Sequence, residues 1–309
     1  MKNFINLKDI PSKDLRRILN DAKKRKNKRK KLNTLEIDKD QPLRGKLIIQ
    51  MYEKPSSRTR LSFHLSIAQL GGSSITIKAS ELHLGKRGET LADTAKILST
   101  YGDAFMLRTD SDKKIEDFSE NLNIPIINLL SPSSHPCQVL SDIFTVEEIK
   151  NKSISKLNIC WIGDCNNVLN SLIAASVKFK FNLNVGCPKN YSPPRFVLNW
   201  VKKNKRKINI FNDPKKAAKN ADVVFSDKVV SLNDKGNIAK KIKDFKNFRI
   251  NSSLMKVAQP NSIFLHCLPR GNEVSEEVFL GKKSRVWQQA LNRVHVQKSI
   301  LLYSFGKLR

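Results

Sequence analysis

The chain has 309 residues and a formal net charge of +29, from 57 Lys and Arg against 28 Asp and Glu. Its length favours two domains, and 39% apolar with 28% charged residues excludes a disordered polyelectrolyte. The charge suggests a nucleic-acid or anionic-membrane partner, but 41 Lys against 16 Arg and only 7% aromatic residues favour a Lys-rich solvated surface on an ordinary soluble protein.

Short β-rich runs alternate with helical patterns through the first half of the chain. In chain order we expect a helix at 8–31, a strand at 47–52, a helix at 58–70, a strand at 73–78, a helix at 91–101, a strand at 103–108, a helix at 113–122, a strand at 124–129 and a helix at 137–150. Gly71 and Gly72 are expected to end the second of these helices.

The second half repeats the same rhythm. We expect a strand at 157–163, a helix at 168–179, a strand at 182–187, a helix at 195–203, a strand at 208–211, a helix at 214–220, a strand at 221–227, a helix at 252–258, a strand at 262–268 and a last helix at 286–304. Strands alternating with helices imply parallel sheets built from right-handed βαβ units. The sequence therefore predicts an α/β fold with two domains, each a mainly parallel sheet flanked by helices.

The N-terminal residues, the uncharged stretches and the cysteines limit where the protein can be located and which kinds of site it can have. The first residues lack the apolar core of a secretory signal. The longest stretch without Lys, Arg, Asp or Glu, Asn121 to Ser141, contains three prolines, so we expect no membrane-spanning helix. Five cysteines without a C-x-x-C pair argue against a disulfide framework or a zinc ribbon. A reducing cytoplasm fits best.

In open parallel sheets, ligands bind beyond the carboxyl ends of the strands. After the first strand comes E-K-P-S-S-R-T-R, in which Ser56, Ser57, Arg58 and Thr59 open a helix. Backbone N–H groups, hydroxyls and an arginine at a helix start can hold a phosphate or carboxylate, and Arg108 from another strand end could join them. The alternative is a capped helix with exposed arginines. The spacing of a Walker loop or a dinucleotide fingerprint is absent.

Polar residues follow other strands too. His135 and Gln138, at another helix start, could hold a carbonyl oxygen and an adjacent NH2 group, although a His beside Pro is more often structural. Asp227 and Asn167 suit the ammonium and carboxylate groups of a substrate, although such an Asp is a helix cap about as often. Cys267 could equally be a small buried hydrophobic residue.

Five ordered motifs together resemble the aspartate/ornithine carbamoyltransferase family over essentially the whole chain, and within it the members that use ornithine. They are E-K-P-S-S-R-T-R-L-S-F, H-P-C-Q-V-L-S-D, W-I-G-D-C-N-N, H-C-L-P and A-L-N-R-V-H-V-Q-K-S-I-L. The resemblance implies a carbamoyl-phosphate domain at 1–148 and an ornithine domain at 149–285, with a C-terminal helix at 286–309 that crosses back to the first. It implies a cytoplasmic homotrimer, or a multiple of trimers, in arginine biosynthesis, without cofactor, metal, nucleic acid or membrane.

The family's functional residues can be carried over motif by motif. The resemblance implies catalytic roles for Arg58, Arg108, His135 and Cys267. Carbamoyl phosphate would be bound by Ser56, Ser57, Arg58, Thr59, His83 from a neighbouring subunit, Arg108, His135, Gln138, Cys267, Leu268 and Arg293. Ornithine would be bound by Asn167, Asp227, Ser231 and Leu232. The implied reaction transfers the carbamoyl group of carbamoyl phosphate to the δ-amine of L-ornithine, giving L-citrulline and phosphate.

The sequence departs from the family pattern at several positions. The acceptor loop, usually D-T-W-V-S-M-G, reads D-K-V-V-S-L-N at 227–233, which leaves the acceptor amine less certain than the reaction. His83 stands where Gln is usual, Cys165 where Gly is usual, and Leu291 where Glu is usual. Alternatives are a carbamoyltransferase for an N-acylated ornithine or putrescine and, from another class, a basic nucleic-acid-binding protein.

We hypothesise that Cys267 orients the amine or accepts its proton.

Overall fold

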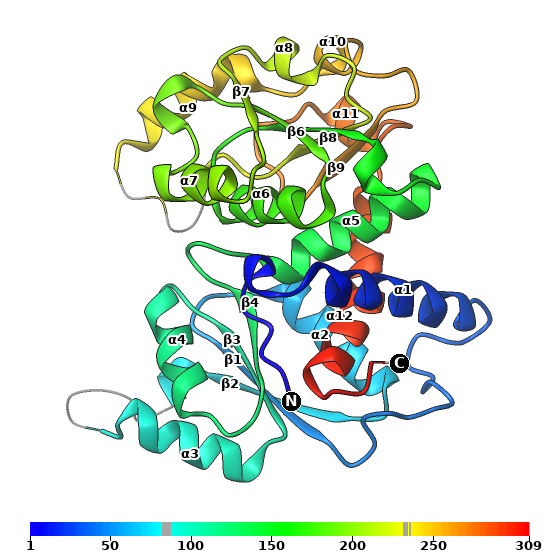
Figure 1. Cartoon of the computed structure of the whole chain (residues 1–309), viewed down its shortest axis with the longest axis vertical. Coiled ribbons are helices and arrows are strands. Elements are labelled where there is room, and N and C mark those ends of the chain that lie inside the picture. Colours follow the sequence, from blue (N-terminus) through cyan, green and yellow to red (C-terminus); the bar gives the residue numbers. More distant parts are fainter. Residues whose placement is uncertain (82–87, 231–233, 235, 309) are drawn as a thin grey trace. The chain divides into compact units, whose positions relative to one another are not determined.

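The computed structural model describes residues 1–81, 88–230, 234 and 236–308 (Figure 1). The chain forms two compact units, each with its own parallel sheet. Unit 1 comprises Met1–Ser141 and Ala290–Arg309, and unit 2 comprises Asp142–Gln289. The divisions fall inside α5 (Pro136–Lys150) and α12 (Val286–Ser304), so each of these helices contributes residues to both units.

Unit 1 contains a four-stranded parallel sheet with the strand order β2-β1-β3-β4. Besides parts of α5 and α12, its elements are α1 (Ser12–Lys28), β1 (Leu47–Tyr52), α2 (Ser57–Gln69), β2 (Ser73–Lys78), α3 (Leu91–Tyr101), β3 (Ala104–Arg108), α4 (Asp112–Asn121) and β4 (Ile126–Leu130). The first helix starts later than expected because Pro11 precedes it and residues 7–9 form a separate 3-10 turn.

Helices cover both faces of this sheet. Apolar side chains of α3 and α4, among them Leu98 and Phe118, pack against Phe105 and its neighbours, and the rings of Phe105 and Phe118 lie 5.0 Å apart. Figure 1 shows α2 and α12 on the opposite face. There the Ser66 hydroxyl of α2 donates to the Val294 carbonyl of α12 at 3.0 Å. The C-terminal helix therefore packs back onto the first unit, as expected.

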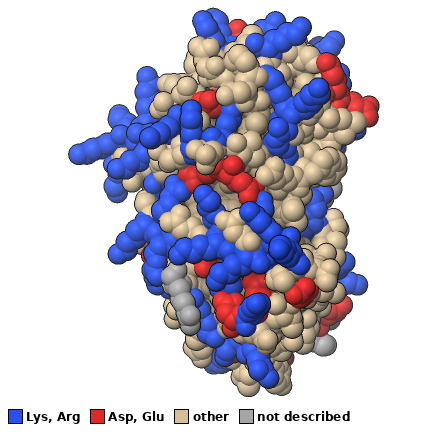
Figure 2. All heavy atoms as spheres, turned by 90° about the vertical axis from the view of Figure 1, so that its right-hand side faces the viewer, with Lys and Arg blue, Asp and Glu red and all other residues tan. Residues whose placement is uncertain are grey.

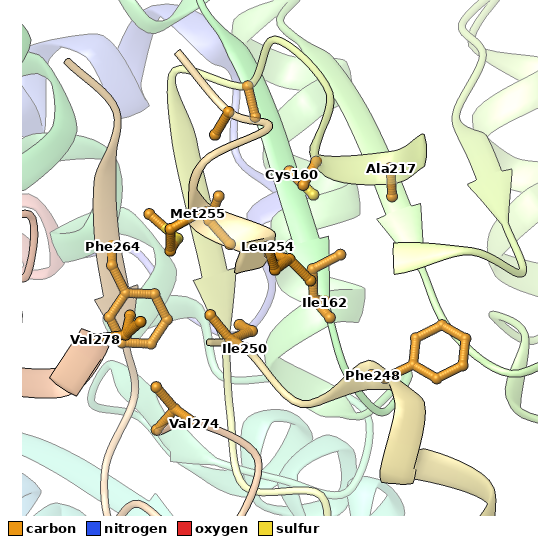
Figure 3. Close-up of a cluster of buried hydrophobic side chains, with 14 of the residues drawn as sticks. Cys160, Ile162, Ala217, Phe248, Ile250, Leu254, Met255, Phe264, Val274 and Val278 are labelled. Carbon is orange, nitrogen blue, oxygen red and sulfur yellow. The ribbon is translucent and has the colours of Figure 1, made fainter. Parts of the chain in front are cut away.

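Unit 2 contains a five-stranded parallel sheet with the strand order β7-β6-β5-β8-β9. Its remaining elements are β5 (Asn158–Ile162), α6 (Asn167–Phe179), β6 (Asn182–Gly186), α7 (Arg195–Lys203), β7 (Asn209–Phe211), α8 (Pro214–Ala218), β8 (Val223–Ser226), α9 (Ile238–Phe245), α10 (Ser252–Met255), β9 (Ile263–His266) and α11 (Glu276–Leu280). Cys160 and Phe264 of the sheet meet Ala217, Leu254 and Val278 of the helices in one apolar cluster (Figure 3).

The predicted alternation of strands and helices in two parallel-sheet units is confirmed. Two helices, α9 and α11, were not predicted. Among the described residues no helix combines the length and hydrophobicity needed to cross a bilayer. On the face drawn in Figure 2, Lys and Arg are spread widely over the surface, whereas Asp and Glu form smaller groups.

Both sheets have a topological switch point, where successive connections leave in opposite directions along the sheet. In unit 1 the chain moves from β1 outward to β2 and returns to place β3 on the other side of β1. In unit 2 it moves from β5 to β6 and β7 and returns to place β8 beside β5. Ligands of open α/β sheets bind at such points, beyond the carboxyl ends of the strands. Ligand sites are therefore expected at the ends of β1 and β3 and at the ends of β5 and β8.

Candidate active site

An anion-binding arrangement lies at the ends of β1 and β3. Arg108 is the last residue of β3 and pairs in register with Tyr52, the last residue of β1. Its Nη1 donates a 3.0 Å hydrogen bond to Oγ of Ser56, the N-cap residue of α2. Ser56 makes no side-chain capping bond to α2, so its hydroxyl serves the arginine instead. The positive end of the helix and the guanidinium thus meet at the strand ends.

Glu53, one residue beyond β1, braces this arrangement. Its carboxylate accepts hydrogen bonds from the Thr109 hydroxyl at 2.5 Å and from the ammonium of Lys114. Its backbone N–H donates to the Arg108 carbonyl at 3.0 Å. These bonds tie the chain after β1 to the chain after β3, which fixes the base of the Arg108 side chain.

Arg293 of α12 joins two other segments of unit 1. Its Nη1 donates to Oε1 of Gln138 on α5, and its Nη2 donates to Oγ1 of Thr59 on α2, both at 2.7 Å. All three residues are buried, with Arg293 only 3% exposed. The rigid fork of a guanidinium suits two such bonds at once. Because the Thr59 hydroxyl accepts from Arg293, its own hydrogen can be donated to a ligand oxygen.

His135 precedes α5 and is 3% exposed. Burial, and then the positive charges of Arg293, Arg108 and Arg58, lower the pKa of its imidazole well below 6.5. The ring is therefore neutral near pH 7, and a neutral imidazole can donate one N–H to a ligand. Ser57 and Arg58, in the first turn of α2, are exposed. This group of residues in unit 1 can bind a small dianion and polarise a carbonyl group.

A second candidate site lies in unit 2, at the ends of β5 and β8. Asn166 caps α6, because its Oδ1 accepts from the N–H groups of Val168 and Leu169 at 3.0 and 3.2 Å. Its Nδ2 donates to Oδ2 of Asp227, just beyond β8, at 2.8 Å. One amide side chain therefore fixes the start of α6 and orients the carboxylate across the switch point. The predicted Asn167 is the first residue of α6 and is partly buried.

Asp227 is partly buried, and removal of its carboxyl group from water raises its pKa. The hydrogen bonds from the Lys228 backbone and from Asn166 act in the opposite direction. A carboxylate held by an amide in a partly dry place is suited to an ammonium group.

His266, the last residue of β9, shapes the segment that contains Cys267 and Leu268. Its Nδ1 accepts from the backbone N–H of Leu268 at 2.9 Å, so the ring proton lies on Nε2, 3.1 Å from Oε1 of Glu273. This imidazole and Glu273 are both buried. Burial raises the pKa of Glu273, but the hydrogen bonds from His266 and from the Gly271 backbone outweigh it, so that the pKa is lowered. The pair holds Leu268 in a left-handed conformation with φ of 53°.

Cys267 is partly buried, and its backbone N–H donates to the Ser226 carbonyl at 3.4 Å. That bond places Cys267 beside the end of β8, from which Asp227 follows. The thiol therefore belongs to the same strand-end region as the acceptor carboxylate.

The structure thus brings the predicted residues together in two groups. Unit 1 gathers Ser56, Ser57, Arg58, Thr59, Arg108, His135, Gln138 and Arg293, and unit 2 gathers Asn167, Asp227, Cys267 and Leu268. The predicted His83, Ser231 and Leu232 lie outside the described residues. Asn166, His266 and Glu273 were not predicted as functional residues. Asn166 could have been found as the N-cap-type residue directly before a helix.

Within residues 1–81, 88–230, 234 and 236–308, no three His, Cys, Asp or Glu side chains are grouped so that they could hold a metal ion.

Comparisons with known proteins match the two parts of the chain to two family models. Residues 2–148 match the family model described as aspartate/ornithine carbamoyltransferase, carbamoyl-P binding domain, and residues 155–304 match the Asp/Orn binding domain. An ornithine carbamoyltransferase of Brucella ovis is 41% identical over 305 residues, which cover 98% of this chain and 95% of the relative. That of Ruthia magnifica is also 41% identical and covers 98% and 99%.

Solved structures are similar over the same extent. Ornithine carbamoyltransferase from Pyrococcus furiosus is 37% identical with a TM-score of 0.89, covering 97% of this chain and 96% of that one. The anabolic ornithine carbamoyltransferase from Campylobacter jejuni is 33% identical with a TM-score of 0.89, covering 99% and 100%. With both family models matched in order and these relatives aligned nearly end to end, the chain belongs to the aspartate/ornithine carbamoyltransferase family.

Proposed function

We propose that this protein transfers the carbamoyl group of carbamoyl phosphate to the δ-amine of L-ornithine, giving L-citrulline and phosphate. The observation that carries the proposal is the pair of switch points with opposite charge. Arginines and a helix start lie at β1 and β3, and a carboxylate oriented by an amide lies at β5 and β8. A phosphate dianion suits the first, and an amino acid with two amino groups suits the second.

Unit 1 would bind the donor. Ser56, Ser57, Arg58 and Thr59 at the start of α2 would hold the phosphate together with Arg108, whose guanidinium is already oriented by Ser56. Bidentate arginine contacts and a helix N-terminus both stabilise the additional negative charge that the phosphate carries as it leaves.

The carbamoyl group would be held by the buried residues of the same unit. Neutral His135 and the Thr59 hydroxyl would donate to the carbonyl oxygen, on which negative charge develops when the amine attacks. Gln138, whose Oε1 accepts from Arg293, would accept from the carbamoyl NH2 through the same oxygen, because an amide oxygen can accept two hydrogen bonds. Arg293 would thus act by orienting Gln138 and Thr59, and by lending its positive charge.

Unit 2 would bind the acceptor. Asp227 would hold an ammonium group of ornithine, and Asn167 would contact its α-carboxylate. Ser231 and Leu232 would complete the site, and Leu268 would adjoin the donor. The charge of Asp227 alone favours the ammonium form of an amine, whereas only the neutral δ-amine can attack. We therefore assign to Cys267, beside the end of β8, the role of orienting the amine or receiving its proton.

The chemistry balances without a covalent intermediate. The δ-nitrogen forms a bond to the carbonyl carbon, the bond from that carbon to the phosphate oxygen breaks, and the oxygen leaves with the electron pair. The proton lost by the nitrogen ends on the phosphate, directly or through Cys267. Much of the acceleration would come from holding two substrates in line.

We further propose a homotrimer in the cytoplasm that serves arginine biosynthesis, with His83 contacting the site of a neighbouring subunit. Exposed apolar side chains on unit 1 support the assembly. The edge strand β2 exposes 50% of Ile75, and nearby elements α2 and α3 expose 65% of Leu61 and 42% of Ile97. Exposed apolar edges of this kind are normally covered by a partner. The biosynthetic direction is supported by the relative from Campylobacter jejuni, which is described as anabolic.

An acceptor panel tests the function. Purified protein and carbamoyl phosphate are incubated with ornithine, N-acetylornithine, putrescine or aspartate, and the ureido product is quantified. We expect kcat/KM for ornithine to exceed that of each other amine by at least about 100-fold, because a site built to pair with charged groups rejects analogues that lack them. A preference for putrescine or the acylated amine would overturn the assignment of the acceptor.

A further inference from the structure

A lysine outside the groups described above connects the two segments that follow β5 and β8, where the acceptor is proposed to bind. Lys241 lies on α9, and its Nζ is 2.7 Å from Oδ2 of Asp164. The same ammonium is 3.0 and 2.9 Å from the two carboxylate oxygens of Asp234. The Lys241 side chain is 12% exposed, and those of Asp164 and Asp234 are 15% and 21% exposed. One ammonium therefore holds two largely shielded carboxylates.

The two carboxylates belong to the two strand ends that form the switch point. Asp164 follows β5 and lies two residues before Asn166, and its carbonyl accepts from the Trp161 indole at 3.1 Å. Asp234 follows β8 and lies seven residues after Asp227. Lys241 thus links, outside the site, the same two segments that the Asn166–Asp227 hydrogen bond links inside it.

The Lys241 ammonium keeps two like charges close together. Burial lowers the pKa of Lys241, but the hydrogen bonds to Asp164 and Asp234 outweigh it and raise the pKa overall. The group is therefore charged throughout the physiological range. Without it, two carboxylates with little access to water would face each other, and like charges in such a place repel strongly.

Packing restrains the start of the segment after β8, because Val229 is buried in the apolar cluster of unit 2. A pocket of about 320 Å³ opens beside the bridge and is lined by Tyr191, Asn237, Lys241 and Asp244, among others. Beside this open space, the ion pairs of Lys241 hold Asp234 to Asp164.

We propose that Lys241 is a positioning residue for the acceptor: by holding Asp164 and Asp234 together, it keeps Asn166 and Asp227 in the geometry that binds the amino acid. This inference rests on the proposed function in unit 2 and deepens it. Lys241 touches no substrate in this account, and its effect passes through the two strand-end segments.

Kinetics of three variants test the proposal. Lys241→Met keeps the stem and removes the charge, Lys241→Arg restores a charge, and Lys240→Met removes an exposed neighbouring charge as a control. We expect Lys241→Met to raise KM for ornithine about tenfold or more with KM for carbamoyl phosphate within about twofold of wild type. The arginine variant should recover most of the loss, and the control should match wild type. An unchanged KM for ornithine in folded Lys241→Met would overturn the proposal.

Two further measurements separate this inference from the proposed function. Asp164→Asn should raise KM for ornithine similarly, and its combination with Lys241→Met should be no worse than Lys241→Met alone, because both break one bridge. Additive effects would argue against a shared bridge. Amide hydrogen exchange at 163–167 and 222–230, which requires no activity, should be at least about threefold faster in Lys241→Met. If wild type forms no citrulline, the function fails, and unchanged exchange still decides against Lys241.

Discussion

Asn166 donates a 2.8 Å hydrogen bond from Nδ2 to Oδ2 of Asp227, and this bond joins the segments that follow β5 and β8. The two strands are neighbours in the sheet but are separated by two other strands in sequence. The bond therefore exists only because the chain reverses direction along the sheet at β5. It places an oriented carboxylate where α/β sheets bind their ligands.

Asn166→Ala should weaken acceptor binding. The variant loses both the bond to Asp227 and the cap of α6, so we expect KM for ornithine to rise about tenfold and stability to fall by about 1 kcal/mol. Asn251→Ala is a matched control, because Asn251 caps α10 in the same unit through the Leu254 N–H at 3.0 Å. It should lose similar stability and keep its KM. Identical kinetics in the two variants would contradict a role for Asn166 in the site.

Arg293→Lys should impair use of the donor. A lysine cannot donate to Gln138 and Thr59 in the fixed geometry of a guanidinium, so we expect kcat/KM for carbamoyl phosphate to fall about 100-fold, or about 2.7 kcal/mol. Arg285→Lys is the control, since the Arg285 guanidinium donates to the backbone carbonyls of Lys282 and Ser284. Steady-state kinetics on both variants, with circular dichroism to verify folding, decide the matter. Equal losses in both would remove the special role of Arg293.

Lys298 should make stability depend on pH in an unusual direction. This residue is wholly buried on α12 and lies 2.9 and 3.0 Å from the carboxylate oxygens of Asp38. Burial lowers its pKa from 10.5 to about 8, although Asp38 opposes the shift. Between these two values the unfolded chain binds more protons at this position than the folded one. The contribution of Lys298 to the free energy of unfolding therefore rises with pH across that window.

Lys298→Met isolates the effect, because Asp38 keeps its hydrogen bonds from Arg29 and Arg25. Urea unfolding of wild type and variant at pH 7.5 and 10 gives the difference in unfolding free energy at each pH. We expect wild type to gain about 1–3 kcal/mol relative to the variant between these pH values. A relative loss, or no change, would show that Lys298 is charged in the folded protein at pH 10.

Ile75→Lys should disrupt the proposed trimer. Ile75 lies on the exposed edge strand β2, where a lysine would oppose pairing with another subunit. Light scattering coupled to size exclusion should show a trimer for wild type and a smaller species for the variant. Phe196→Lys, at a side chain on α7 of unit 2 that is 67% exposed, should leave the trimer intact. A trimeric Ile75→Lys variant would exclude β2 from the interface.

Much of the fold can be predicted from the sequence, because strands buried in parallel sheets consist of short runs of apolar residues. β1, with L-I-I-Q-M-Y, and β2 match their predicted bounds. Helix α9 escaped prediction because only Ile238, Ile242 and Phe245 mark an apolar face, and the first two are themselves 46% and 52% exposed. Helix α11 has five residues, too few for a helical period to be recognised.

Several residues of the candidate site could be named from the sequence, but their contacts could not. Arg108 and Asp227 stand out because each is a polar residue at the end of a strand. Which strand ends meet depends on strand order, which is set by tertiary packing rather than by local pattern. The bonds of Arg293 to Thr59 and of His266 to Glu273 likewise join segments that no periodicity relates. Lys241 lies on a helix that the pattern does not reveal.

The most direct test of the account is the stoichiometry of one reaction with the wild-type protein. Carbamoyl phosphate and ornithine are supplied together, and citrulline and phosphate are measured in the same samples over time. We predict that the two products appear in equal amounts and at rates that depend on ornithine. Phosphate release that is independent of ornithine, without citrulline, would contradict the assignment of the two switch points to donor and acceptor.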